Sequence, residues 1–268
     1  MAYPAQETRA AGFLPDGSPL QFHFYDKSCP NVEKIVRQVV SSAVASEARM
    51  AGSLLRLHFH NCFVQGCDGS LLLESIAGVV DAIKAALEQE CPGIVSCADI
   101  LALAARDSVA VSGGPSYPVQ LGRRDSLTAN RELANKNLPG FNFNVTDLVA
   151  AFANVGLSAR DMARCNTFAA RLTPILRIPQ LSVHPTVLCS SSNAQQARLA
   201  MPCNRGLLHS DQVLYSTPGA TRDLVNLYAQ SNSAFAKDFS VGMLKMGSIT
   251  PLTGSEGQVR NQCGYVNA

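Results

Sequence analysis

An arginine and a histidine lie four positions apart in the segment Arg56-Leu57-His58-Phe59-His60. Together with Arg49 and Ser53 they have spacings of three and four residues, which places these polar side chains on one stripe of a helix. An imidazole so placed can take a proton from one oxygen of a peroxide and return it to the other, while the guanidinium stabilises the departing anion. A polar stripe on an apolar helix also fits a solvated face, so the spacing leaves both interpretations open.

The segment that follows can form a small loop rich in oxygen atoms. Cys62 and Cys67 lie five residues apart and can close it with a disulfide. Side-chain and carbonyl oxygens of this kind are the ligands that calcium prefers. The donors are Asn61, Val64, Gly66, Asp68 and Ser70. Asp-Gly-Ser is also a common turn, so the loop by itself is a weak metal signal.

The elements that position these residues are predicted to be helices. Apolar residues at helical spacing and capping residues predict helices over 32–45, 49–63, 79–88, 97–109, 146–155, 158–163, 221–230 and 233–246. Asn31 is the expected cap of the first helix and Ser96 of the fourth. The fourth is apolar nearly all round and should run through the core. Strand signals are sparse, so we expect one mainly α domain over 21–268, preceded by an irregular tail at 1–20 and with a divergent segment at 172–204.

Composition and cysteine content limit the class of protein. The net charge of +2 gives no argument for nucleic acid, and no stretch approaches the roughly 20 apolar residues that span a bilayer. The nine cysteines are dispersed, which favours disulfides and an oxidising compartment, and their odd number leaves at least one thiol unpaired. The segment 1–20 lacks a basic start followed by an apolar core, so no signal peptide is visible there.

Several motifs together resemble class III plant secretory peroxidases. The distal half-site of that family is similar to Ser53-Leu54-Leu55-Arg56-Leu57-His58-Phe59-His60, followed by Cys62-Phe63-Val64 and Gly66-Cys67-Asp68. Other matching stretches are Ser28-Cys29-Pro30, Val95-Ser96-Cys97-Ala98-Asp99, Gly122-Arg123-Arg124-Asp125, Asn137-Leu138-Pro139, Gly206-Leu207-Leu208-His209-Ser210-Asp211 and Lys245-Met246-Gly247. The resemblance covers residues 22 to about 168 and then 205 to the end.

The resemblance implies a mainly α, two-lobed helical haem-peroxidase fold with haem b and calcium as cofactors. His60 would be the distal acid–base and Arg56 the charge stabiliser. Arg49, Ser53 and Phe59 would border the haem pocket, and Pro139 the entry of small phenolic donors. The oxygen donors of the loop would hold the distal calcium. The implied disulfides are Cys29–Cys91, Cys62–Cys67 and Cys97–Cys263, and the implied location is extracellular or vacuolar.

The sequence also departs from the family pattern. Asn61 stands where the family has Asp, and Glu74-Ser75-Ile76 passes straight to Ala77 without the family's intervening loop. Asp161-Met162 runs directly into Ala163-Arg164, so the segment with the proximal iron-binding histidine is missing. That iron ligand is therefore unknown.

Other departures follow from the missing segment. Asp211, which resembles the haem-pocket carboxylate that polarises the proximal histidine, is left without its partner. His184 is a candidate substitute for the iron ligand. In 172–204 no proximal calcium loop is recognisable. Either Cys189 or Cys203 could pair with Cys165. The peroxidase fold is thus expected to be incomplete.

These observations support three hypotheses. The first is a monomeric haem peroxidase that reduces hydrogen peroxide and oxidises phenolic donors by single electrons, with no nucleic-acid or membrane partner. The alternative is a catalytically impaired peroxidase-fold scaffold, or a truncated gene product that lacks the iron ligand. The third is a chain that does not fold stably, because deleting a core segment can remove more than the roughly 5–15 kcal/mol of a typical folded state.

Overall fold

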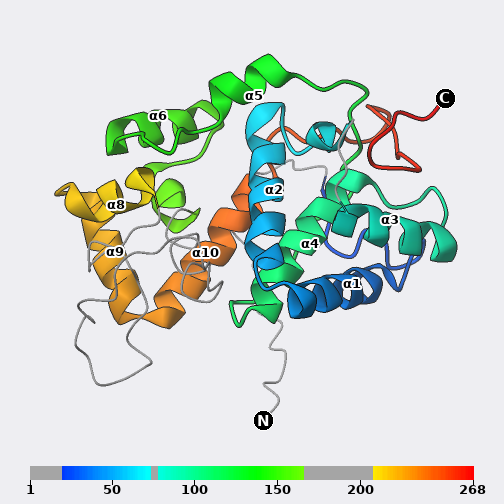
Figure 1. Ribbon diagram of the computed structural model, residues 1–268, viewed down its shortest axis with the longest axis horizontal. Coiled ribbons are helices and arrows are strands. Elements are labelled where there is room, and N and C mark those ends of the chain that lie inside the picture. The colour runs from blue at the N-terminus through cyan, green and yellow to red at the C-terminus, as the bar shows by residue number, and fades with distance from the viewer. Residues whose placement is uncertain (1–19, 74–77, 166–207) are drawn as a thin grey trace, which may run out of the picture.

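The computed structural model describes residues 20–73, 78–165 and 208–268 (Figure 1). Within these ranges the chain is helical and has no strand, which confirms the mainly α prediction. The helices are α1 (Val32–Ser46), α2 (Met50–Val64), η1 (Ser70–Leu72), α3 (Gly78–Glu90), α4 (Cys97–Val111), α5 (Arg131–Asn137), α6 (Val145–Asn154), α8 (His209–Ser216), α9 (Ala220–Gln230) and α10 (Asn232–Gly247). Residues 159–165 are also helical.

Some of the predicted features lie outside the described residues. These are the tail up to residue 19, the abrupt connection at 74–77, the divergent segment 172–204 with His184, and the candidate partners Cys189 and Cys203. None of the helices in the described part of the chain is long and apolar enough to cross a membrane.

Helix α4 is the centre of one group of helices. Its residues from Cys97 to Val109 are all buried, as its apolar character on every side predicted, and α1, α2 and α3 pack around it. Ser96 caps it by accepting a hydrogen bond from the Asp99 N–H at 3.1 Å. The buried Asp125 carboxylate adds acceptors for the N–H groups of Cys97 and Ala98, at 3.1 and 2.9 Å. The start of α4 therefore has its free N–H groups satisfied without water.

A second group consists of α6, α8 and α9. Figure 1 shows this group on one side of the molecule and α1, α3 and α4 on the other, with α2 and α10 between them. Contacts of α6 with α8, of α8 with α9 and of α9 with α10 hold the second group together, and α10 also contacts α2. The helix that carries the Arg/His stripe thus lies where the two groups meet.

The helix boundaries agree with prediction to within a few residues, with two kinds of exception. Asn31 is the N-cap residue of α1, as predicted, but its side chain forms no capping hydrogen bond, and its amide donates to Glu90 at 2.7 Å. Helices α5 and α8 were not predicted, because both are short and α5 has no buried residue that could give an apolar period.

Three disulfides lie within the residues that the structure describes. They join Cys29 to Cys91, Cys62 to Cys67 and Cys97 to Cys263, which are the pairings implied by the family resemblance. Cys165 forms no disulfide within the described residues, and burial raises the pKa of its thiol to about 12.

The junction between Asp161-Met162 and Ala163-Arg164 lies inside a continuous helical segment, residues 159–165. Met162 and Ala163 are fully buried on either side of the junction. Arg164 donates to Asp161 one turn earlier at 2.7 Å and also pairs with Asp238 of α10. The helix therefore continues through this junction, and a buried ion-pair cluster lies beside it.

Candidate active site

The Arg/His stripe is on the outward face of α2. Nε of Arg56 donates a hydrogen bond of 3.1 Å to Nε2 of His60, one helical turn later. Arg56 is exposed and His60 half-buried. Because the arginine N–H is a donor only, Nε2 of His60 must be the acceptor nitrogen of a neutral imidazole.

The environment of His60 favours this neutral form. Burial, followed by the positive charge of Arg56, lowers the pKa of His60 to about 4. At neutral pH the imidazole can accept a proton, and the guanidinium beside it is permanently charged. The pair therefore combines a base and a fixed positive charge at one place, as its spacing predicted.

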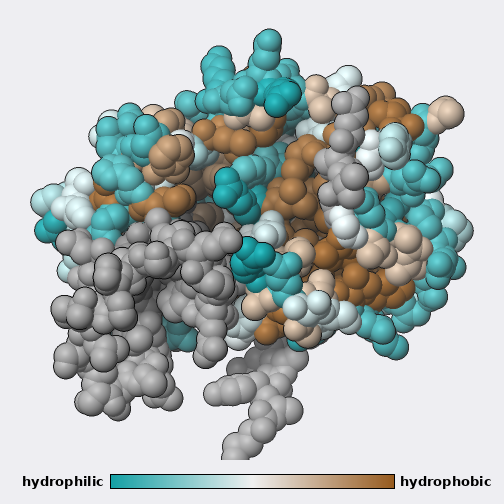
Figure 2. Space-filling view, viewed as in Figure 1, coloured by the Kyte–Doolittle hydropathy of each residue, from teal (hydrophilic) through white to brown (hydrophobic). Residues whose placement is uncertain are grey.

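The other predicted pocket residues of α2 divide between two environments. Arg49 and Ser53 are exposed on the same stripe; Arg49 pairs with Glu47, and Ser53 Oγ donates to the Arg49 carbonyl at 3.2 Å. Phe59 instead stacks on Phe63, with ring centres 4.2 Å apart. Figure 2 shows hydrophilic and hydrophobic surface side by side along the position of α2.

Pro139, which is expected to border the donor entry, lies near the C-terminal end of α2. Nδ2 of Asn137, the last residue of α5, donates to the Val64 carbonyl at 3.1 Å, and Pro139 follows two residues later, half-buried. Phe141, two residues after Pro139, has 70% of its surface exposed. The α5 segment is thereby held beside the C-terminal end of the helix that carries His60.

The predicted calcium loop is compact and almost completely buried. Asn61, Asp68 and Ser70 are buried, and the disulfide between Cys62 and Cys67 closes the loop. Gly66 has a φ of +105°, and a Cβ there would lie 2.2 Å from the Thr250 carbonyl oxygen. Only glycine fits this position, where the loop packs against the chain that follows α10.

Asp211 is a buried carboxylate without a charged partner among the described residues. It is 4% exposed, and its Oδ2 accepts a hydrogen bond of 3.1 Å from the Leu208 N–H. Burial raises its pKa to about 6. A buried acid with a single backbone donor costs folding free energy, so this group is placed as if for a partner that the described residues do not supply.

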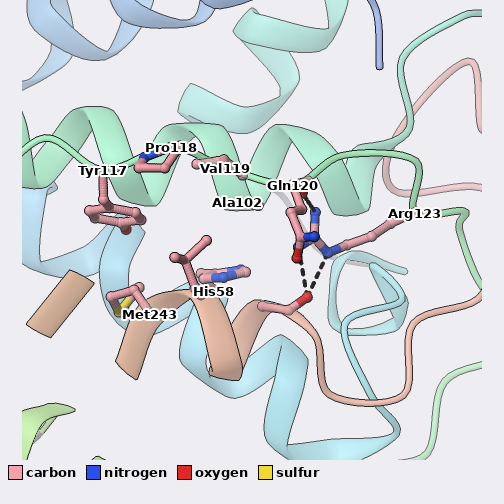
Figure 3. Close-up of a pocket in the computed structure, with 10 residues that line it drawn as sticks. His58, Ala102, Tyr117, Pro118, Val119, Gln120, Arg123 and Met243 are labelled. Atoms are coloured by element: carbon pink, nitrogen blue, oxygen red, sulfur yellow. Dashed lines mark hydrogen bonds between the residues drawn. The ribbon is translucent and has the colours of Figure 1, made fainter. Parts of the chain in front are cut away.

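The other described histidines do not fill that role. His23 is exposed beside Asp26, and His209 is exposed at the first residue of α8. His58 points away from the Arg/His stripe into a small cavity, which Tyr117, Gln120 and Arg123 also line (Figure 3). Burial and then the charge of Arg123 lower the pKa of His58 to about 3, so it is a neutral packing residue.

Two buried arginines were missed by the sequence reasoning. Arg123 donates to the carboxylate of Asp99 at 2.7 Å and to the Gly247 carbonyl, which joins α4 to the end of α10. Arg260 donates to the carbonyls of Gly69 and Cys263. Arg260 lies three residues before Cys263, so its position beside the loop could have been inferred once the disulfide to Cys97 was assumed.

Comparison with known proteins places this arrangement in context. The family model described as peroxidase matches residues 36–231. Peroxidase 4 of Vitis vinifera is 43% identical over 296 residues, covering 92% of this chain and 92% of that protein. Peroxidase 70 of Zea mays is 43% identical and Peroxidase P7 of Brassica rapa subsp. rapa 40%, covering 91% and 92% of this chain and 91% and 100% of theirs.

This chain is shorter than its alignment with the Vitis vinifera relative. The match to the Vitis vinifera protein extends over 296 positions, whereas this chain has 268 residues. Some positions of that relative therefore have no counterpart here, in agreement with the abrupt connections seen in the sequence.

Proposed function

Because this chain belongs to the family of class III plant peroxidases, we propose that it reduces hydrogen peroxide with small phenolic molecules as one-electron donors. Peroxidase activity and haem and calcium binding are properties of the family. The observation that carries the proposal is the hydrogen-bonded pair of Arg56 and the neutral His60. Within the described residues these are the groups suited to proton transfer and charge stabilisation at one site.

The distal side of a haem pocket fits the described residues. Haem, when bound, would supply the iron that stores the two oxidising equivalents of hydrogen peroxide until the donors are oxidised. Nε2 of His60 accepts a proton from one of the two peroxide oxygens. The proton replaces the hydrogen bond that Arg56 donates to this nitrogen in the structure. The same nitrogen returns the proton to the departing oxygen, while the Arg56 guanidinium stabilises the negative charge there. Arg49 and Ser53, on the same stripe, are suited to hold a propionate.

The described residues do not provide an iron ligand for the proximal side of the haem pocket. The described residues include no histidine that contacts Asp211, and His184 lies outside them. A specific observation thus favours the second candidate function, a peroxidase-fold scaffold without turnover. It is the buried Asp211, whose pKa burial raises to about 6 and which has no charged partner among the described residues.

Location, calcium affinity and oligomeric state follow from the same membership. Three disulfides within the described residues require an oxidising compartment, so we propose an extracellular or vacuolar protein. We also propose a monomer, because no feature of residues 20–73, 78–165 and 208–268 demands a partner chain. Asn61 contributes no charge to the distal loop, so its calcium affinity should be lower than that of relatives with Asp there.

A donor-oxidation assay separates the two functions. The purified chain is incubated with haem, freed of excess, and given hydrogen peroxide and a phenol. The proposal expects turnover that His60→Leu lowers at least about a hundredfold, since general acid–base groups contribute roughly 10²–10⁴-fold. His58→Gln is the control, because His58 faces the cavity on the other side of α2. Equal turnover in the natural chain and in His60→Leu would contradict the role of His60.

A further inference from the structure

The loop from Asn61 to Ser70 has little negative charge for a calcium site. Asp68 is its only acidic side chain. Nowhere in the part of the chain that the structure describes do three or more His, Cys, Asp or Glu side chains form a group suited to a metal ion. Calcium affinity depends strongly on the number of charged ligands, so one carboxylate leaves most of the charge of the ion uncompensated.

The side chain of Asn61 presents a donor to the interior of the loop region. Its Oδ1 accepts a hydrogen bond of 2.8 Å from the Gly69 N–H. Its Nδ2 is buried and has no hydrogen-bond partner within the described structure. Turning the amide over would bring the NH₂ group against the Gly69 N–H, and two donors would then face each other. A carboxylate at this position would have a second acceptor oxygen, whereas Asn61 has an N–H that repels a cation.

A buried arginine contacts this part of the loop. Arg260 is fully buried, donates to the Gly69 carbonyl and pairs with the Asp125 carboxylate at 3.9 Å, and the negative charge of Asp68 also attracts its guanidinium. Gly69 has a φ of +68°, and a Cβ there would lie 2.7 Å from Nη2 of Arg260. Glycine therefore allows the guanidinium to approach the loop closely.

The Asp68 carboxylate and the Val64 carbonyl also accept hydrogen bonds from N–H groups of the protein. Gln65 Nε2 and the Ser70 N–H donate to the two carboxylate oxygens of Asp68, at 3.3 and 3.0 Å. Asn137 Nδ2 donates to the Val64 carbonyl at 3.1 Å. Together with the Cys62–Cys67 disulfide, these contacts give the loop a fixed shape without a metal ion.

We propose that the Asn61–Ser70 loop of this chain is calcium-independent, because Arg260 and neighbouring amide groups stabilise it in place of the ion. The inference rests on membership of the peroxidase family and does not depend on whether the chain turns over peroxide. It identifies Asn61 as the residue that excludes calcium.

Thermal unfolding of the whole chain in millimolar calcium chloride and in EDTA tests the proposal. The natural chain should have the same Tm in both, within about 1 °C, because a ligand that does not bind the folded state cannot stabilise it. Asn61→Asp should gain a rise in Tm of several degrees in calcium and a binding isotherm of one ion in titration calorimetry. Asn154→Asp, which adds the same charge at the exposed end of α6, should gain neither.

Two results would overturn the proposal. One is a calcium-dependent rise in the Tm of the natural chain that Asp68→Asn removes, since the ion would then be bound by this loop. The other is an Asn61→Asp variant that folds and still gains no calcium binding. A rise that Asp68→Asn leaves unchanged belongs to another part of the chain and agrees with the proposal. Because the natural chain is itself compared in the two buffers, the test holds even if a variant fails to fold.

Discussion

Nε of Arg56 lies 3.1 Å from Nε2 of His60, on the outward face of α2. Burial disfavours a positive charge on the imidazole, and the positive charge of Arg56 at this distance disfavours it further. The pKa of His60 is accordingly lowered to about 4. The protein thus keeps a base in its unprotonated form through most of the acidic range, which is the chemical requirement for accepting a proton from peroxide.

Removing the charge of Arg56 should raise the pKa of His60. Arg56→Gln removes the second of the two causes and leaves burial in place, so the value should rise from about 4 but stay below the ordinary 6.5. The measurement is an NMR titration of the imidazole C–H protons. His58, whose pKa depends on burial and Arg123, is the internal control and should not move. An unchanged pKa of His60 would show that Arg56 does not act on it.

Replacing Asp211 should stabilise the protein at neutral pH. Its folded pKa of about 6 is above the unfolded value of 3.8, so the folded state binds the extra proton. The cost of the charged carboxylate is therefore absent below about pH 4, grows as the pH rises towards 6 and is complete above it. Asp211→Asn keeps an oxygen for the Leu208 N–H and should add up to about 3 kcal/mol to the free energy of unfolding at pH 7.5.

Denaturant unfolding at two pH values checks the Asp211 prediction. The gain from Asp211→Asn should be present at pH 7.5 and vanish near pH 4. Asp223→Asn, at an exposed carboxylate in the first turn of α9, is the matched control and should show no such gain. A less stable Asp211→Asn variant at pH 7.5 would mean that the carboxylate has a cationic partner.

The ion-pair cluster at the helical junction should contribute substantially to stability. Arg164 is buried between Asp161 and Asp238, so Arg164→Leu leaves the buried Asp161 with Lys245 as its remaining cationic partner. Breaking such a buried pair should cost about 3 kcal/mol. Arg160 pairs with the same Asp238 but is mostly exposed, and Arg160→Ala should cost less than about 1 kcal/mol. Equal costs in denaturant unfolding would exclude a special role for the junction.

The sequence predicted the helical stripe on α2 more accurately than the surroundings of the loop. Helical spacing is a local property, so Arg49, Ser53, Arg56 and His60 could be placed on one face from the chain alone. The hydrogen bond between Asn137 and Val64 spans 73 residues and that between Arg260 and Gly69 spans 191. Local sequence patterns do not reveal such contacts, because they depend on the tertiary arrangement that the disulfides and helix packing produce.

The short helices show the same limit. Helix α5 lacks any buried residue, and its start depends on Asn130, which accepts from the Leu133 N–H at 2.9 Å. With no apolar stripe, periodicity could not identify it. The capping hydrogen bond expected from the Asn31 side chain is absent for a different reason. The side-chain amide of Asn31 donates to Glu90, which is distant in sequence.

The visible spectrum of the purified chain after reconstitution with haem tests the central claim most directly. If the chain is a haem peroxidase that uses His60 and Arg56, it should take up one haem per chain and give a strong Soret band that shifts within the mixing time of hydrogen peroxide. His60→Leu should keep the band and slow the shift by at least about a hundredfold. Failure of the natural chain to take up stoichiometric haem, or an equally fast shift in His60→Leu, would contradict the account.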